Sequence, residues 1–209
     1  MMRPMRSPAL RTLSVLTLGL AALVAVAFAT THTAEAAKPK KKYYFEVAEV
    51  KASDSLGQAG KDLVAVTTTQ VTKSIGAHEQ LVATLDGAPD RAKGKQFKAW
   101  LKKKKLSGAY RVNVELISFE EELEEKDDSL NKEKRLIIRL ALRTFGETIP
   151  DRVMGFTGEG SATVKLDVGK KLRPRDREYA ITQALELAMT DALASSLNKL
   201  ATPQDTPKK

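Results

Sequence analysis

Two stretches in the second half of the chain alternate between apolar and polar residues. Tyr110–Leu116 places a tyrosine, two valines and a leucine on one side, and Lys134–Phe145 repeats the pattern with leucine, isoleucine and arginine. A period of two residues is typical of a strand with one buried and one solvent-facing side. Both stretches are therefore predicted to be strands of one sheet, and their solvent-facing side would carry Arg135, Arg139 and Arg143.

A longer stretch, Asp176–Leu200, repeats its apolar residues every three or four positions, as a helix with one buried face does. Pro174 and Asp176 are typical of a helix start, and Pro203 is typical of the region after a helix end. We therefore predict a long C-terminal helix that lies across the sheet. Its alanines would allow close approach to the strands, and its buried face would hold Ile181, Ala184, Leu185, Ala188, Met189, Ala192, Leu193, Leu197 and Leu200.

The remaining patterns predict strands at Tyr43–Lys51, Gln80–Leu85 and Val153–Leu166, and a helix at Lys61–Ile75. Glycines inside the last strand indicate a bulge, or a place where side-chain bulk is excluded, at Gly155, Gly158 and Gly160. The fold class expected is α/β, in the form of an α+β two-layer sandwich. Its sheet would be mostly antiparallel and covered by the long C-terminal helix and one or two shorter helices.

Seven of the nine residues in Glu120–Asp128 are acidic. This density predicts a long solvated hairpin loop between the two alternating strands. Calcium binding is the alternative, because carboxylate oxygens are its preferred ligands. The stretch lacks the alternating Asp/Asn residues and the central glycine of a calcium loop, so we expect no metal site.

The first 36 residues have the pattern of a secretory signal peptide. Three arginines precede the uncharged apolar run Leu13–Ala29, and small residues at Ala34 and Ala36 suit cleavage before Ala37. An uncleaved membrane anchor is the alternative, because the run approaches the roughly 20 residues that span a bilayer. The domain organisation expected is a signal peptide at 1–36, a basic leader at 37–42, one domain at 43–201 and a disordered tail at 202–209.

Composition restricts where the protein works. The chain contains no cysteine, which excludes disulfides, thiol catalysis and the modified cysteine that anchors a bacterial lipoprotein. The formal net charge is +9, and it stays positive when the signal peptide is removed. We therefore expect a basic periplasmic or secreted protein, most typical of a bacterium, that is not a lipoprotein.

Positive charge is concentrated in Arg91–Lys105, which contains no acid. A short helix over residues 94–105 would carry Phe97 and Trp100 on one face and lysines on the rest. Such a segment can bind an acidic protein, an anionic polymer or lipid head groups, although a core-packed helix with a solvated lysine face is the alternative. The candidate binding residues are Arg91, Lys93, Lys95, Phe97, Lys98, Trp100, Lys102, Lys103, Lys104 and Lys105.

The arginine row is a second candidate, with cross-strand pairing to glutamates such as Glu115 as the alternative. The sequence offers few candidate catalytic residues, because His78 is the only histidine beyond the predicted signal peptide. Zinc would lack its usual ligands, Gly158–Gly160 is too short for a phosphate loop, and we expect neither a cofactor nor catalytic residues.

The segment RLIIRLALRTFGETIPDRVMGFTGEGSA, residues 135–162, followed by the helix YAITQALELAMTDALASSLNKL, resembles the small α/β domain of several bacterial envelope-assembly proteins. These include the curli secretion-channel lipoprotein, the lipoprotein activators of penicillin-binding proteins and the amino-terminal domain of the Tol-system β-propeller protein. The resemblance implies a binding or assembly module without catalytic residues. The missing lipid-bearing cysteine, the acidic stretch and the lysine helix depart from it.

We therefore expect a non-enzymatic module that supports cell-envelope assembly or maintenance through an envelope protein or an anionic envelope polymer or lipid. Export makes nucleic acid a partner that we do not expect. The alternatives are a carboxylate-based hydrolase of an envelope polymer, which needs an acidic cleft, and a binder of anionic lipid or lipopolysaccharide.

The signal peptide can be tested by mass. When the whole chain is expressed in a Gram-negative host, the periplasmic protein should have the mass of a chain that starts at Ala37, because the peptidase cuts after small residues. Intact-mass spectrometry of the periplasmic and membrane fractions measures this. Recovery of the full-length mass in the membrane fraction would instead establish the anchor.

Overall fold

The computed structural model describes residues 40–126 and 133–202, so the predicted signal peptide and the predicted tail from 203 onward lie outside the described residues. In chain order the elements are β1 (Lys42–Ala52), a 3-10 turn η1 (Asp54–Leu56), α1 (Gly57–Ala77), β2 (Leu81–Val82), α2 (Gly94–Lys103), β3 (Leu106–Glu125), β4 (Lys134–Thr148), β5 (Met154–Val168) and α3 (Pro174–Ala201). Within these ranges no helix combines the length and the hydropathy that crossing a membrane requires.

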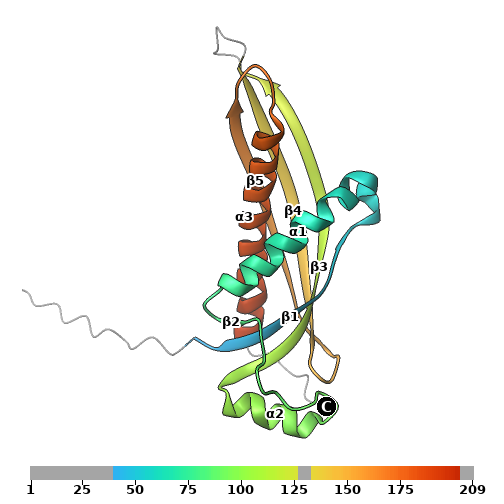
Figure 1. Cartoon of the computed structure of the whole chain (residues 1–209), viewed down its shortest axis with the longest axis vertical. Helices are drawn as coiled ribbons and strands as arrows, with labels where there is room; N and C mark the ends of the chain where they lie inside the picture. The colour runs from blue at the N-terminus through green and yellow to red at the C-terminus, as the bar shows by residue number, and fades with distance from the viewer. Residues whose placement is uncertain (1–39, 127–132, 203–209) are drawn as a thin grey trace, which may run out of the picture. The chain divides into compact units, whose positions relative to one another are not determined.

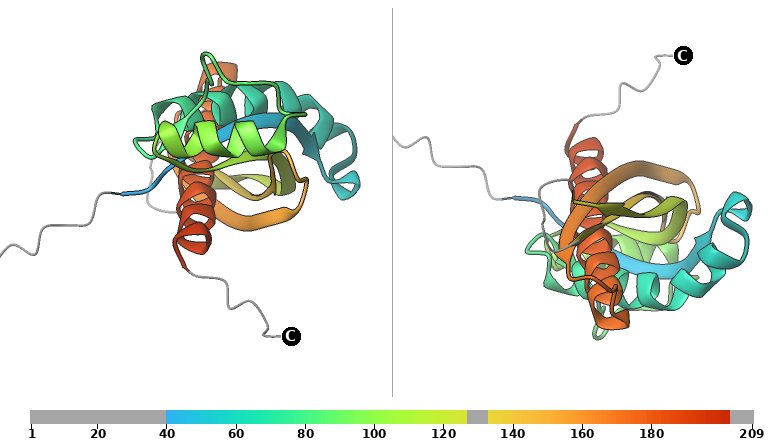
Figure 2. Two further views of the ribbon diagram at one scale, coloured as in Figure 1. Left: turned by 90° about the horizontal axis from the view of Figure 1, so that it is seen from below. Right: turned by 90° about the horizontal axis from the view of Figure 1, so that it is seen from above.

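The five strands form one mixed sheet in the order β2-β1-β3-β4-β5 (Figure 1). β1 pairs in parallel with β2 and with β3, and α1 and α2 belong to the crossovers that parallel pairing requires. β3, β4 and β5 are long antiparallel strands that curl together (Figure 2). The predicted fold class, an α+β sheet closed by a long C-terminal helix, is confirmed.

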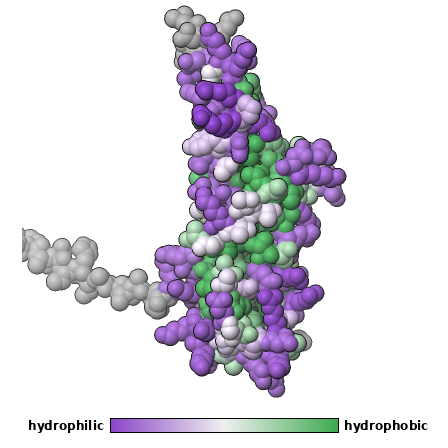
Figure 3. Space-filling model, in the orientation of Figure 1, coloured by the Kyte–Doolittle hydropathy of each residue, from purple (hydrophilic) through white to green (hydrophobic). Residues whose placement is uncertain are grey.

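Helices cover both faces of β1, because successive residues of a strand point to opposite faces. Tyr43 and Phe45 point into the main core under α1 and α3, whereas Tyr44 points into a smaller core under α2. Figure 3 shows hydrophobic residues along the middle of one side of the molecule, with hydrophilic residues at its ends. As the alternation predicted, the main core includes Leu136, Ile138, Leu140 and Leu142 of β4 and Ala184, Leu185, Ala188 and Met189 of α3.

Four aromatic rings hold β1, β3 and β5 together near the start of β5. Phe45 stacks on Phe156 with centroids 5.1 Å apart, and Tyr110 meets the same Phe156 ring edge-on at 5.3 Å. Gly146 of β4 leaves room for the Phe156 ring, because a Cβ at residue 146 would overlap it. Tyr43 completes the cluster with a centroid 6.2 Å from that of Tyr110.

The acidic stretch is not the solvated loop that the sequence predicted. Residues 120–125 belong to β3 and pair with residues 134–139 of β4. The strand continues because cations face these acids: Arg139 lies opposite Glu120, and Arg177 of α3 forms an ion pair with Glu121 at 2.8 Å. The prediction placed Asp127 and Asp128 in the same loop, and these lie outside the described residues.

The predicted strand at 80–85 is much shorter in the structure. Only Leu81 and Val82 pair with β1, opposite Tyr43 and Tyr44. The rest of the segment leads to Gly87, which has a φ of +73°. The chain turns there and continues toward α2. The sheet therefore has one very short edge strand, β2, and one long edge strand, β5.

The long edge strand packs against α3 with almost no side-chain atoms between the two backbones. A Cβ at Gly158 would collide with the Ser196 hydroxyl, and a Cβ at Gly160 would collide with the Ala188 carbonyl and the Ala192 amide. Buried hydroxyls fill the remaining space, because Thr144 and Ser196 share a hydrogen bond of 2.8 Å. The bulk exclusion predicted for these glycines is thus confirmed, as is the close approach of the alanines.

A methyl group at this contact should separate the helix from the sheet. We expect Gly160→Ala to lower the free energy of unfolding by about 1–3 kcal/mol, because the rigid backbone of α3 has to move. Urea denaturation followed by circular dichroism measures the change. Gly169→Ala is the matched control, since a Cβ there meets nothing within 4 Å, and an equal loss in both variants would contradict the interpretation.

Candidate functional site

The basic segment predicted as a binding site forms α2, and two buried side chains hold this helix against the sheet. Phe97 is fully buried and Leu101 is 6% exposed, and both pack with Tyr44 and Ala109 in the smaller core. Trp100 is partly buried, with its ring centroid 6.4 Å from that of Phe97. Phe97 therefore positions the helix and does not face solvent.

The lysines lie on the outer side of α2 and beyond its end. Lys105, two residues beyond the end of α2, has the left-handed conformation, with φ at +58°, and β3 begins at the next residue. The Lys104 ammonium lies 5.6 Å from the centroid of the Trp100 ring, within the range of a cation–π contact. All lysines of the segment are exposed, namely Lys93, Lys95, Lys98, Lys102, Lys103, Lys104 and Lys105.

The turn between β4 and β5, residues 148–153, is joined to α2. The Lys98 ammonium lies 2.7 Å from the Asp151 carboxylate, and the Ile149 amide donates a hydrogen bond of 2.8 Å to the Ala109 carbonyl in β3. At the start of α2, a Cβ at Gly94 would lie 3.3 Å from the Pro150 ring. The helix and the turn form one end of the molecule (Figure 1), which we call the basic end: residues 91–105, Arg111 and residues 148–153.

Two cationic pockets flank Thr148 and Ile149 at this end. The lysine pocket, with a volume of about 540 Å³, lies between α2 and the turn and is lined by Lys98, Lys102 and Lys105. The arginine pocket, of about 350 Å³, is lined by Arg91, Arg111 and Arg152. One carboxylate lines each pocket, Asp151 in the lysine pocket and Glu147 in the arginine pocket.

Most cations of the basic end have no carboxylate partner. The segment Arg91–Lys105 contains eight cations. Within the described residues only two of them form ion pairs: Arg91 contacts Glu46 at 2.7 Å, and Lys98 contacts Asp151. The Arg91–Glu46 pair lies beside the Tyr44 phenol, whose pKa is raised by burial and by the Glu46 charge. The remaining positive charge is available to an anionic ligand.

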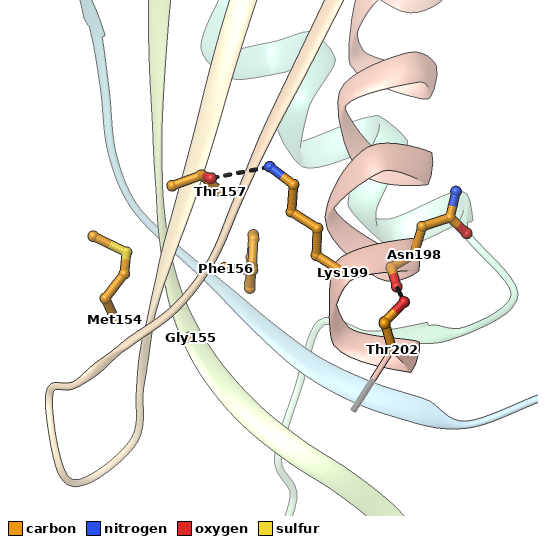
Figure 4. Close-up of a pocket in the computed structure, with 7 residues that line it drawn as sticks. All are labelled: Met154, Gly155, Phe156, Thr157, Asn198, Lys199 and Thr202. Atoms are coloured by element: carbon orange, nitrogen blue, oxygen red, sulfur yellow. Dashed lines mark hydrogen bonds between the residues drawn. The ribbon is translucent and has the colours of Figure 1, made fainter. Parts of the chain in front are cut away.

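A third pocket, of about 460 Å³, lies between the start of β5 and the end of α3. Figure 4 shows Phe156 at its centre and Lys199 reaching across to Thr157, to whose hydroxyl it donates a hydrogen bond of 3.2 Å. Met154, which is 57% exposed, lies at its outer side. No carboxylate, histidine or cysteine lines this pocket, so its lining suits apolar contact more than acid–base chemistry.

The second candidate, the arginine row on the open face of the sheet, is engaged in cross-strand ion pairs. Arg139 contacts Glu122 at 2.9 Å and Arg143 contacts Glu159 at 3.0 Å, so the predicted pairing with glutamates is confirmed for these two. Glu115 lies opposite Arg143 in register, but the ion pair found for it is to Lys51, at 3.9 Å.

The third arginine of the row is paired with an aspartate instead of a glutamate. Arg135 lies 2.8 Å from Asp167, and Lys126 reaches the other oxygen of that carboxylate at the same distance. Hydrogen bonds from both cations lower the pKa of Asp167 to about 2. The row therefore holds strands β3, β4 and β5 together on the open face.

Sequence reasoning located α2 but missed the other half of the basic end. No local pattern in the sequence joins Arg111 or Arg152 to α2. Their proximity to Arg91 follows from the pairing of β1, β3 and β4, which the sequence does not display. The only sequence signals for this half of the basic end were the proline and glycine residues near the turn, which are typical of a turn.

No known family model and no curated protein matches this chain. Among solved structures it is similar to a protein of Xanthomonas campestris, with 11% identity, 79% of this chain and 88% of that chain covered, and a TM-score of 0.42. It is also similar to a minor lipoprotein of Acinetobacter baumannii, with 12% identity, coverage of 78% and 96% respectively, and a TM-score of 0.36. A third likeness is to rare lipoprotein B of Shewanella oneidensis, with 11% identity, coverage of 72% and 92%, and a TM-score of 0.33.

Two of these three proteins are lipoproteins by name, and none is one of the envelope-assembly proteins that the sequence resembles. At TM-scores of this size we infer neither family nor function from the likeness. The absence of a lipid anchor stays a prediction from the missing cysteine.

The Asp167 ion pairs give a prediction on pH. Because the folded pKa is lowered to about 2, their contribution to stability is present above the pKa of the unfolded carboxyl, near 4, and is lost as the pH falls through about 2. The Asp167 carboxyl resonance in a carbon-13 NMR titration should therefore have its midpoint near 2. Arg135→Gln should raise that midpoint, and an unchanged midpoint would contradict the assigned cause.

Proposed function

We propose that this protein is a non-enzymatic module of the bacterial cell envelope that supports assembly or maintenance of the cell surface by binding an anionic macromolecule. The N-terminal pattern supports export, and the basic end supplies the contact surface. One observation carries the proposal: within the described residues, six of the eight cations in Arg91–Lys105 have no carboxylate partner. They are presented on a helix that Phe97 and Leu101 hold in place.

The unpaired charge on this anchored helix favours a binding role over the alternative, a lysine face that is only solvated. Cations that serve only solubility need no fixed arrangement, whereas the unpaired Lys102 and Lys105 line one pocket together, and Arg111 and Arg152 line the other. A charged surface of this kind attracts an anionic partner and speeds its association.

The arrangement of carboxylates supports a non-enzymatic role over hydrolysis. A carboxylate-based hydrolase needs two acidic side chains at a fixed separation in one cleft. Each of the three pockets described above holds one carboxylate or none. The acids of β3, such as Glu121 and Glu122, form ion pairs with arginines instead.

Crosslinking in cells tests the proposal. The tagged protein should recover a defined envelope partner after mild crosslinking, and changing Lys102–Lys105 to glutamine should abolish that recovery. The matched control changes four exposed lysines elsewhere, Lys61, Lys73, Lys170 and Lys171, and removes the same charge. Equal recovery by all three proteins would overturn the assignment of the basic end, and equal loss in both variants would show that net charge alone acts.

A further inference from the structure

Two large apolar residues are exposed in succession where the turn of the basic end meets β5. Val153, the last residue of the turn, is 59% exposed, and Met154, the first residue of β5, is 57% exposed. Three other large apolar side chains are strongly exposed in the described chain, namely Leu123, Tyr179 and Leu187, and none of them lies at the basic end. Exposed apolar residues beside clustered cations are typical of surfaces that contact a membrane interface.

We propose that the basic end docks on an anionic lipid surface, where the lysine and arginine pockets receive head-group phosphates and Val153 enters the interface. This inference rests on the basic end being the contact surface of the proposed function, and it adds an anionic membrane as a second contact beside the macromolecular partner. The lysines of α2 and the turn both belong to this end of the molecule, so one surface could engage both features together (Figure 1).

The kind of cation at the basic end suits an anionic lipid surface. All six unpaired cations of the segment are exposed lysines, and one of them, Lys104, also lies over Trp100. Lysine is depleted in the cores of protein interfaces, where arginine and aromatic residues are enriched. On an anionic bilayer each lysine acts as a point charge toward a fluid array of phosphates, and no fixed partner geometry is required.

A second copy of this chain is a poorer partner. Three acids of its β3 stretch are already engaged, because Glu120 and Glu122 contact Arg139, and Glu121 is held by Arg177. Binding of these three acids to the lysines of another copy would have to displace those contacts.

Vesicle co-sedimentation tests the inference with the exported protein, after mass spectrometry has shown that residues 1–36 are absent. Vesicles of phosphatidylcholine and phosphatidylglycerol in equal amounts should bind the protein, and vesicles of phosphatidylcholine alone should not. Changing Lys102–Lys105 to glutamine should weaken binding by roughly 600-fold, at about five-fold for each of the four lysines. Added salt should weaken the binding of the unchanged protein.

The apolar contact is tested separately with Val153→Asp, which should weaken vesicle binding by about 10-fold because it replaces an apolar side chain with a repelled charge. The matched control is Leu187→Asp, an equal change at a residue of α3 that is 53% exposed, and it should bind as the unchanged protein does. Circular dichroism confirms that each variant is folded.

Two results would overturn the inference. If Val153→Asp and Leu187→Asp bind vesicles equally well, the turn does not enter the interface. If no vesicle binding occurs while the lysine variant still loses its crosslinked partner in cells, the lipid assignment fails and the proposed function stands. If the lysine variant loses neither vesicle binding nor its crosslinked partner, both the lipid inference and the proposed function fail.

Discussion

The close contact between α3 and β5 is the constraint on which the rest of the fold depends. Gly158 and Gly160 let the strand backbone approach Ala188 and Ala192, and Thr144 and Ser196 fill the remaining gap with a buried hydrogen bond. With so few side-chain atoms between them, helix and strand have little freedom to slide. The curl of β3, β4 and β5 therefore has to follow the helix, and the main core is closed on that side.

The position of the basic end follows from the same contact. Since β5 is fixed by α3, the turn that precedes it is fixed as well, and Phe156 secures the start of the strand by stacking on Phe45. The Ile149 amide then binds the Ala109 carbonyl, and Asp151 holds Lys98 of α2. A helix that belongs to a separate small core is thereby held at a defined place on the sheet, and the two cationic pockets result from this placement.

The sequence predicted those parts whose pattern is local. Alternation identified β3 and β4, and the helical repeat identified α3 and its alanine face, because in both cases one buried side imposes a period on neighbouring residues. The acidic end of β3 failed for the opposite reason: its partners, Arg139 and Arg177, are distant in sequence, so the residues looked unpaired and hence solvated. Arg111 and Arg152 were missed as site residues because strand pairing, and no sequence spacing, brings them to Arg91.

The two charged regions of the chain show how folding separates structural charge from available charge. The two regions are the arginine row and the segment Arg91–Lys105. Both carry charge of one sign, and by composition alone each suggests a binding site. In the sheet, each arginine of the row forms an ion pair with a carboxylate of a neighbouring strand. The positive charge of the row is therefore largely balanced within the fold. In the basic segment, ion pairs within the described residues engage only Arg91 and Lys98, so the other lysines remain available to an external anion. Because self-repulsion among such lysines disfavours the folded state, their concentration on one helix is better explained by a partner than by stability.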